Sequence, residues 1–123
     1  MDCPCGIGRY DQHCGPLHAG TPAADAEALM RSRYSAYALG LPDYLLSTWH
    51  PSTRPASLDL HAHPPLHWLG LDVKRHVANG DTAVVEFVAR HRQGGGRAGR
   101  LHETSRFVRE AGRWLYVDGD VTV

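Results

Sequence analysis

A chain of 123 residues, 42% of them apolar and 21% charged, is long enough for one domain with a buried core and too apolar to be disordered. Thirteen basic and thirteen acidic residues give a formal net charge of zero, which argues against nucleic acid as the main partner. No apolar run approaches the roughly 20 residues of a membrane span, and no basic stretch with an apolar segment opens the chain, so we expect neither a span nor a signal peptide.

The first 20 residues contain all three cysteines and show almost no apolar periodicity. An odd number of cysteines clustered at one end is a poor disulfide framework and a good metal-site pattern. Because this segment has too little apolar surface to fold by burial, we expect a bound ion to hold it. Unpaired cysteines also favour a reducing compartment, the cytoplasm.

The spacing of the cysteines fits a zinc site. Cys3 and Cys5 flank Pro4, and after seven intervening residues the chain reaches His13 and Cys14. Zinc is held by thiolate and imidazole donors at tetrahedral corners, and a site with four protein ligands is structural rather than catalytic. The sequence therefore predicts structural zinc bound by Cys3, Cys5, His13 and Cys14.

Three alternatives stay open for this segment. His18 is a substitute fourth ligand if His13 points away. The three thiols could also be free on a frayed terminus. Cys3 as a catalytic nucleophile is the third alternative, although the sequence places no base beside it.

Two helices are predicted before any strand. Thr21 as the N-cap and Pro22 as the first residue start one helix, whose apolar and aromatic residues recur every three or four positions up to a stop at Gly40. A shorter helix covers 42–49, where a proline ends it, and a further helical turn is expected over 57–61.

Beyond residue 66 the apolar residues change from helical spacing to alternation, which predicts strands. Four strands are expected, separated by turns at Asn79-Gly80-Asp81, Gly94-Gly95-Gly96 and Ala111-Gly112. Helices followed by one antiparallel meander predict an α+β fold, with the N-terminal helices packed on one face of a four-stranded sheet.

Blocks spread over almost the entire chain resemble a known family. The segment from Cys3-Pro4-Cys5-Gly6 to His13-Cys14-Gly15-Pro16-Leu17-His18-Ala19-Gly20 is similar to the SEC-C motif, a zinc knuckle also found at the C-terminus of SecA. The remaining blocks resemble the uncharacterised YchJ family: Leu29-Met30-Arg31-Ser32-Arg33-Tyr34-Ser35-Ala36-Tyr37, Thr48-Trp49-His50-Pro51, Trp68-Leu69-Gly70-Leu71, Glu103-Thr104-Ser105-Arg106-Phe107 and Gly112-Arg113-Trp114-Leu115-Tyr116-Val117-Asp118-Gly119. The family usually has two adjacent cysteines where this chain has His13-Cys14, and histidine is an acceptable zinc ligand.

The resemblance implies two parts. Residues 1–20 would form a SEC-C-like zinc knuckle, and residues 21–123 a YchJ-type domain. That domain would have the nuclear transport factor 2-like, or SnoaL-like, fold, in which a curved antiparallel sheet wraps around helices as a cystatin-like cone. The resemblance brings no established activity with it.

The cone is the expected place for a small-molecule ligand, because binding sites are usually concave, mostly apolar and furnished with a few polar groups. We expect Glu103 to point inward, on the same strand face as Leu101, Ser105 and Phe107, towards an arginine of the first helix. The candidate pocket residues are Arg31, Arg33, Tyr34, Trp49, Trp68 and Glu103. A buried ion pair and plain aromatic packing are the structural alternatives to a binding site.

Three functions are compatible with these patterns. The preferred one is a binding or adaptor protein whose zinc knuckle docks a protein partner. A small-molecule-binding protein or enzyme that uses the cone around Glu103 is the alternative, although no set of nucleophile, base and orienting group can be read from the sequence. RNA contact through the basic residues of the glycine-rich hairpin is the third, with Arg90, His91, Arg92, Arg97 and Arg100 as its candidates.

Overall fold

A computed structural model describes residues 1–62 and 64–122, so the predicted domain end at residue 123 lies outside the described residues. Four strands form one antiparallel sheet in the order β1-β2-β3-β4. Their bounds are Leu66–Asn79 for β1, Thr82–Gln93 for β2, Ala98–Glu110 for β3 and Arg113–Thr122 for β4. All three predicted turns lie between consecutive strands. The predicted meander and the α+β fold class are therefore confirmed.

One face of the sheet forms the core because apolar and polar residues alternate along its strands. On β2 the side chains of Ala83, Val85, Phe87 and Ala89 are buried, and on β3 Phe107 is fully buried. The opposite face carries polar pairs such as His102 with Glu86, whose Nε2 and Oε2 atoms lie 2.7 Å apart. The inward direction of the Phe107 face was predicted, and the structure agrees with it.

The longest helix, α2 (Ala26–Leu39), begins later than predicted. Its N-cap is Asp25, whose carboxylate accepts a hydrogen bond of 2.7 Å from the backbone N–H of Ala28. The prediction of Thr21 as the cap is wrong, because the ionised carboxylate of Asp25 satisfies the free N–H groups and complements the helix dipole. The predicted stop at Gly40 is confirmed by its left-handed backbone, with φ of 73°.

Two shorter predictions also needed correction. Helix α3 spans Pro42–Ser47 and ends before the predicted residue 49, because the chain from Thr48 onward pairs with β4. The backbone N–H of Tyr116 donates to the carbonyl of Thr48, and His50 donates to the carbonyl of Tyr116. The helical turn predicted over 57–61 does not form; there the carboxylate of Asp59 accepts from the backbone N–H of His61.

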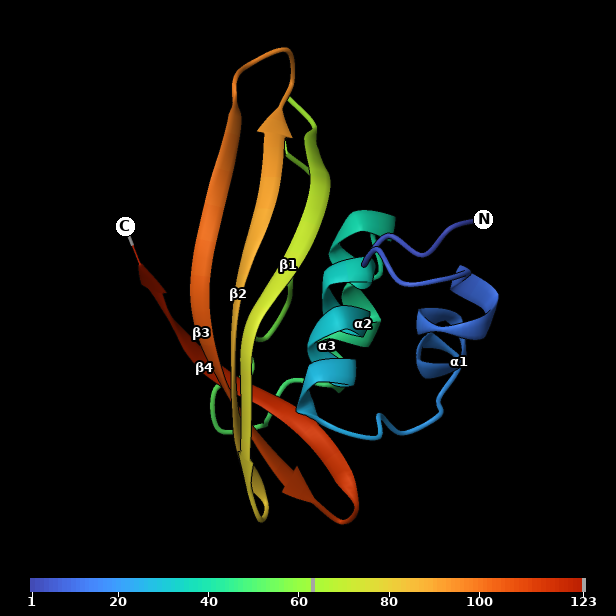
Figure 1. The fold of residues 1–123 in the computed structure, drawn as a ribbon, viewed down its shortest axis with the longest axis vertical. Helices are drawn as coiled ribbons and strands as arrows, with labels where there is room; N and C mark the ends of the chain where they lie inside the picture. The colour runs from blue at the N-terminus through green and yellow to red at the C-terminus, as the bar shows by residue number, and fades with distance from the viewer. Residues whose placement is uncertain (63, 123) are drawn as a thin grey trace.

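The elements form three layers: the sheet, then helices α2 and α3, then the N-terminal segment with the short helix α1, Cys14–His18 (Figure 1). Helix α2 packs against β1 and β2 on one side and contacts α1 on the other. A 3-10 turn, η1 (Tyr10–Gln12), precedes α1. Helix α2 is therefore the element through which the N-terminal segment is attached to the sheet. None of the described helices has both the length and the apolar composition that a membrane crossing needs.

Candidate metal centre and cone cavity

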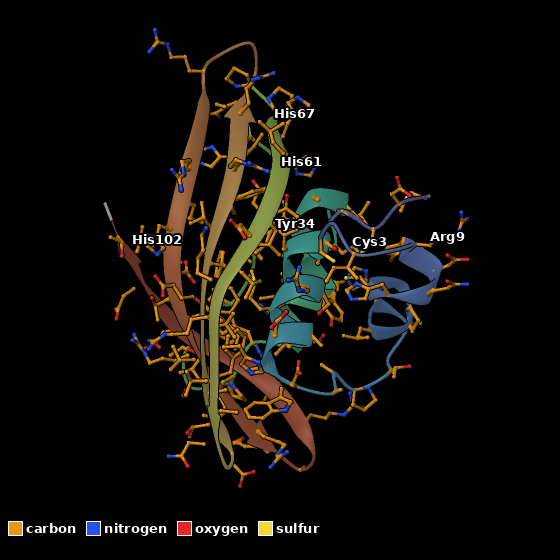
Figure 2. The ribbon with its side chains drawn as sticks, in the orientation of Figure 1. Cys3, Arg9, Tyr34, His61, His67 and His102 are labelled. Atoms are coloured by element: carbon orange, nitrogen blue, oxygen red, sulfur yellow. The ribbon has the colours of Figure 1, made fainter. Side chains whose placement is uncertain are left out.

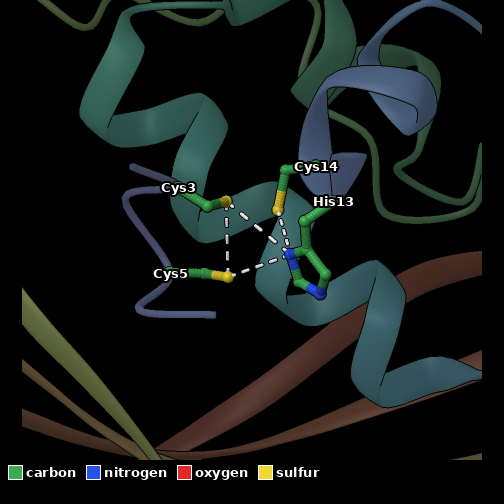
Figure 3. A group of neighbouring side chains, drawn as sticks. All are labelled: Cys3, Cys5, His13 and Cys14. Carbon is green, nitrogen blue, oxygen red and sulfur yellow. Dashed lines mark hydrogen bonds between the residues drawn. The ribbon is translucent and has the colours of Figure 1, made fainter. Parts of the chain in front are cut away.

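The loop that carries Cys3 and Cys5 is a tight turn closed by its own backbone. The N–H of Cys3 donates to the carbonyl of Gly8, and the N–H of Gly6 donates to the carbonyl of Cys3. Gly6 and Gly8 have φ of 94° and 61°, a region that residues with a Cβ avoid. The turn places both thiols on its inner side, towards helix α2, as Figure 3 shows.

The other two side chains of the cluster come from consecutive residues, His13 and Cys14. Both reach the cluster because helix α1 begins between them. His13 has an extended φ of −128° and precedes α1, whose first residue is Cys14. Adjacent residues would point apart in a strand. The change into α1 instead brings both side chains to the thiols of Cys3 and Cys5.

Four of the six distances between the ligand atoms match those of a tetrahedral site, and all six are within 4.8 Å. The sulfur atoms of Cys3 and Cys5 lie 3.5 Å apart, and the His13 Nδ1 atom lies 3.7, 3.3 and 3.4 Å from the sulfurs of Cys3, Cys5 and Cys14. Donors about 2.0–2.3 Å from a zinc ion are about 3.3–3.8 Å from one another at tetrahedral corners. The donor set therefore fits a zinc-sized ion, and Figure 3 shows all four side chains pointing to one point.

Ionisation of the thiols favours the same conclusion. A hydrogen bond from Cys14, helped by the backbone N–H of Ile7, lowers the pKa of Cys5 to about 5. The same contact with Cys5, together with burial, raises the pKa of Cys14. One thiolate is stabilised and formation of a second is opposed, because the Cys14 thiol donates its proton to the Cys5 thiolate and is buried, and a second negative charge beside the first would be repelled. A divalent cation removes that repulsion, so the donor set is suited to a metal ion.

Helix α2 supplies further contacts to this cluster. The hydroxyl of Ser35, which is fully buried, donates to the sulfur of Cys14 at 3.3 Å and lies 3.6 Å from the sulfur of Cys3. Arg31 donates to the carbonyl of Cys5 at 3.4 Å and to Glu27 at 3.0 Å. Hydrogen bonds to metal-ligating sulfurs orient the ligands and spread their charge.

His18 lies outside the cluster and has a different role. Its Nδ1 atom is 2.7 Å from the hydroxyl of Tyr10, and its Nε2 atom is 2.8 Å from the carbonyl of Ser32. Both ring nitrogens are therefore engaged, which leaves His13 as the imidazole of the cluster. Arg9, which lies near the cysteines in sequence, points away from them in Figure 2 and pairs with Asp11.

The second site is a cavity of about 280 Å³ between α2 and the sheet. Its walls are mostly aromatic and aliphatic, and the predicted residues Arg33, Tyr34, Trp68 and Glu103 line it. Tyr34 and Trp68 pack edge to face, with 5.8 Å between ring centroids. Figure 2 shows Tyr34 where α2 faces β1.

Two residues of the predicted pocket lie elsewhere. Arg31 points to the cysteine cluster, as described above, because it is on the side of α2 that faces the N-terminal segment. Trp49 packs edge to face on Tyr116, with ring centroids 5.1 Å apart, and lies behind Arg33 as seen from the cavity lining. The position of Arg31 on α2 and the pairing of Trp49 with β4 decided these placements. The spacing of residues in the sequence does not reveal either one.

Arg33 is a buried cation, with 5% of its surface exposed. Its Nη1 atom donates to the carbonyl of Leu45 and to the hydroxyl of Thr48, each at 2.7 Å. The guanidinium carbon lies 5.0 Å from the ring centroid of Trp49 and 4.6 Å from that of Tyr116. Burial lowers the pKa of Arg33, and the aromatic faces offset part of the cost of desolvation.

Glu103 lies in the same cavity without forming an ion pair to Arg33, among the residues that the structure describes. Its carboxylate accepts a hydrogen bond from the hydroxyl of Ser105 and rests over Gly119, where an added Cβ would be 2.5 Å away. The ion pair weighed as the structural alternative is thus absent from the described part of the chain. Two opposite charges line one cavity and remain unpaired with each other.

The basic residues of the glycine-rich hairpin are divided between the two faces of the sheet. His91 turns to the core side, where its ring lies 5.7 Å from that of Trp68. Arg90 and Arg100 are cross-strand partners on the outer face, next to Asp72. Strand alternation thus puts His91 on the opposite face from Arg90 and Arg100, and RNA contact through the hairpin stays a prediction.

One further arrangement was not visible in the sequence. The Nδ1 atom of His50 is 2.7 Å from the hydroxyl of Ser52, and its Nε2 atom is 3.0 Å from the carboxylate of Glu110. This resembles a nucleophile, base and orienting group, but the Glu110 side chain is 57% exposed. A solvated surface chain of this kind lacks the water exclusion that strengthens catalytic groups.

Sequence reasoning missed Ser35. A signal for it exists: Ser32 and Ser35 lie three residues apart on α2, within the stripe of buried residues, where small polar side chains need a specific partner.

Comparison with known proteins agrees with this architecture. The profile described as "YchJ, middle NTF2-like domain" matches residues 25–119. A UPF0225 protein from Ralstonia nicotianae is 58% identical over 132 positions, covering 98% of this chain and 91% of that protein. One from Xanthomonas campestris is also 58% identical, covering 94% and 92%.

A solved structure adds the N-terminal part to this comparison. The solution structure of a SEC-C motif containing protein from Rhodopseudomonas palustris superposes with a TM-score of 0.84 at 41% identity, over 100% of both chains. The predicted fold and family are thereby confirmed. Profile, relatives and structure agree that the chain belongs to the YchJ family, whose middle domain has the NTF2-like fold.

Proposed function

We propose that this chain is a zinc-binding protein in which Cys3, Cys5, His13 and Cys14 hold a structural zinc ion. The observation that carries the proposal is the spacing of the four donor atoms, all within 4.8 Å of one another. Three of the four side chains are buried, and no donor position is left open for a substrate. When bound, zinc would supply four ligand bonds in place of an apolar core for residues 1–20.

Two matched substitutions test the ligand set. The change His13→Ala removes a proposed ligand, whereas His18→Ala removes an imidazole of the same segment that is bonded to Tyr10 and Ser32. We expect one zinc per chain in the natural protein and in the His18→Ala variant, and at least tenfold weaker zinc binding in His13→Ala. The proposal is wrong if protein purified without chelator contains no stoichiometric metal while the N-terminal segment remains ordered.

The first use that we propose for this knuckle is docking of a protein partner. Support comes from Met1 and Ile7, apolar residues of the knuckle that are 63% and 44% exposed. We also infer a reducing, cytoplasmic location, because the three thiols must stay reduced to bind zinc.

A pair of surface substitutions tests docking. Ile7→Ser changes the knuckle, and Val77→Ser makes the same kind of change on the sheet, where Val77 is 50% exposed. We expect Ile7→Ser alone to lose a partner that the natural protein captures. Unchanged capture by Ile7→Ser and by the double variant Cys3→Ser, Cys5→Ser would contradict the adaptor role.

The second candidate function is small-molecule binding in the cone cavity. It is favoured by one observation: the cavity contains Arg33 and Glu103, whose charges are not paired with each other. Indole serves as a probe of the cavity, and Trp68 serves as the reporter. Among the residues that the structure describes, Trp68 is the only one of the three tryptophans that lines the cavity. We expect indole to shift the side-chain N–H resonance of Trp68 and to leave that of Trp114 in place. If indole shifts neither, this candidate fails.

A further inference from the structure

The shape of the cone cavity limits the size of its ligand. A volume of about 280 Å³ is just below the roughly 300–1,000 Å³ that is typical of ligand pockets. Flat aromatic side chains form much of the wall, including Tyr34, Tyr37, Trp68 and Phe107. A cavity of this size and lining is suited to a planar molecule of one or two rings.

The polar groups of the cavity are of two opposite kinds. Arg33 supplies only donors, and its Nε and Nη2 atoms have no hydrogen-bond partner among the described residues. Glu103 supplies acceptors, and Ser105 is the single side chain of the described residues that donates to it. Arg33 is buried and Glu103 is half-buried. A ligand that fills the cavity displaces water from both charges, so it must complete their hydrogen bonding itself.

The balance of charge decides what kind of ligand can do this. An anion would be attracted by Arg33 and repelled by Glu103, and a cation would meet the reverse. A neutral group with a carbonyl oxygen next to an N–H offers each residue the kind of partner it lacks: an acceptor for Arg33 and a donor for Glu103. The mostly apolar walls add a further penalty for any ligand that carries net charge.

We propose that the cone cavity binds a neutral, planar molecule with an amide or lactam edge, whose carbonyl faces Arg33 and whose N–H faces Glu103. This inference rests on the second candidate function, that the cavity binds small molecules. It goes further by assigning the chemical class of the ligand. Arg33 and Glu103 then act as the specificity-determining pair, and the aromatic walls hold the ring.

Three probes of nearly identical shape test the assignment: benzamide, benzoate and benzamidinium. Benzamide presents one acceptor oxygen beside one donor nitrogen. Benzoate presents two acceptor oxygens, and benzamidinium presents two donor nitrogens. Binding is measured from the side-chain N–H resonance of Trp68, with that of Trp114 as the internal control. We expect benzamide to bind at least fivefold more tightly than either ion. Tighter binding of benzoate or benzamidinium overturns the proposal.

Two variants separate charge from shape. Glu103→Gln keeps the size of the side chain and removes its charge, while Glu86→Gln makes the same change on the outer face of the sheet. We expect the ratio of benzamide to benzoate affinity to fall about tenfold in Glu103→Gln and to stay constant in Glu86→Gln. An unchanged ratio in Glu103→Gln overturns the assignment of Glu103. If indole binds and benzamide shows no preference, the ligand class is wrong although the cavity binds small molecules.

Discussion

The N-terminal segment and the sheet are ordered by different forces. In the sheet, alternating apolar residues such as Val85 and Phe107 are buried against α2. In residues 1–20 the buried groups are three thiols, which have polar chemistry and few packing partners of their own. The two regions nevertheless share one core, because Cys3, Cys5 and Cys14 pack into the same cluster as Leu29 and Met30 of α2. We propose that coordination supplements this burial, because the segment is too short to build a core of its own.

Several hydrogen bonds cross the proposed division of the chain at residue 20. They join Ser35 to Cys14, Arg31 to Cys5 and His18 to Ser32. We propose that the knuckle, residues 1–20, is ordered mainly by its own metal ligands. Its position on the protein depends on packing and hydrogen bonds to α2. The following experiments test that distinction.

Metal removal should have the largest effect, and a local one. After treatment of the purified protein with a chelator, we expect amide exchange within residues 3–14 to accelerate at least about a hundredfold, because the turn then keeps only a few hydrogen bonds and its thiol packing on α2. Strands β2 and β3 should keep their protection. Mass spectrometry of hydrogen exchange measures both regions in one sample, and restored zinc is the control. Equal loss of protection in both regions would show that the sheet also depends on the metal.

The change Phe107→Ala tests the region that is held by burial. Phe107 is 1% exposed and lies in the middle of the core, so we expect the free energy of unfolding to fall by about 3–5 kcal/mol. The zinc content should not change. Urea denaturation gives the free energy, and Val121→Ala, at a residue 56% exposed on β4, is the control with an expected change below about 0.5 kcal/mol. If Phe107→Ala lost zinc as well as stability, the metal site would depend on the core of the sheet, and the distinction between the two regions would be wrong.

Ser35→Ala tests whether a hydrogen bond from α2 contributes to metal binding or only to packing. Without its hydroxyl, the sulfurs of Cys14 and Cys3 lose a donor, and we expect zinc affinity to fall about 10–100-fold. Ser32→Ala is the matched control, since Ser32 is also fully buried on α2 but bonds to Leu29 and Tyr44. Competition with a chromophoric chelator measures both variants. Equal affinities would leave Ser35 with a packing role only.

The smallest effect concerns the helix that both regions share. Asp25→Ala removes the cap of α2 and should lower the free energy of unfolding by about 1 kcal/mol. Asp43→Ala, in the first turn of α3 where no side chain caps the helix, should cost less. Thermal unfolding of both variants gives the comparison. A larger loss at Asp43 would contradict the assignment of the cap.

The sequence by itself determined the four strands, the end of α2 and the candidate ligands of the metal centre. Strand alternation, the turns at Gly80 and Gly112, and the stop at Gly40 are local properties, since each depends on the backbone freedom of a few neighbouring residues. The proposed zinc ligands were readable for the same reason. They are close in sequence, and thiols grouped with an imidazole in a segment of so little apolar surface are typical of a metal site.

Tertiary structure alone decided which side chains meet across elements. It placed Arg31 at the knuckle and Arg33 in the cavity, although two positions separate them on one helix. It also gave both ring nitrogens of His18 other partners, and it left Glu103 beside Arg33 without an ion pair. These outcomes depend on how α2 is rotated between two layers, and that rotation is set by packing against both at once.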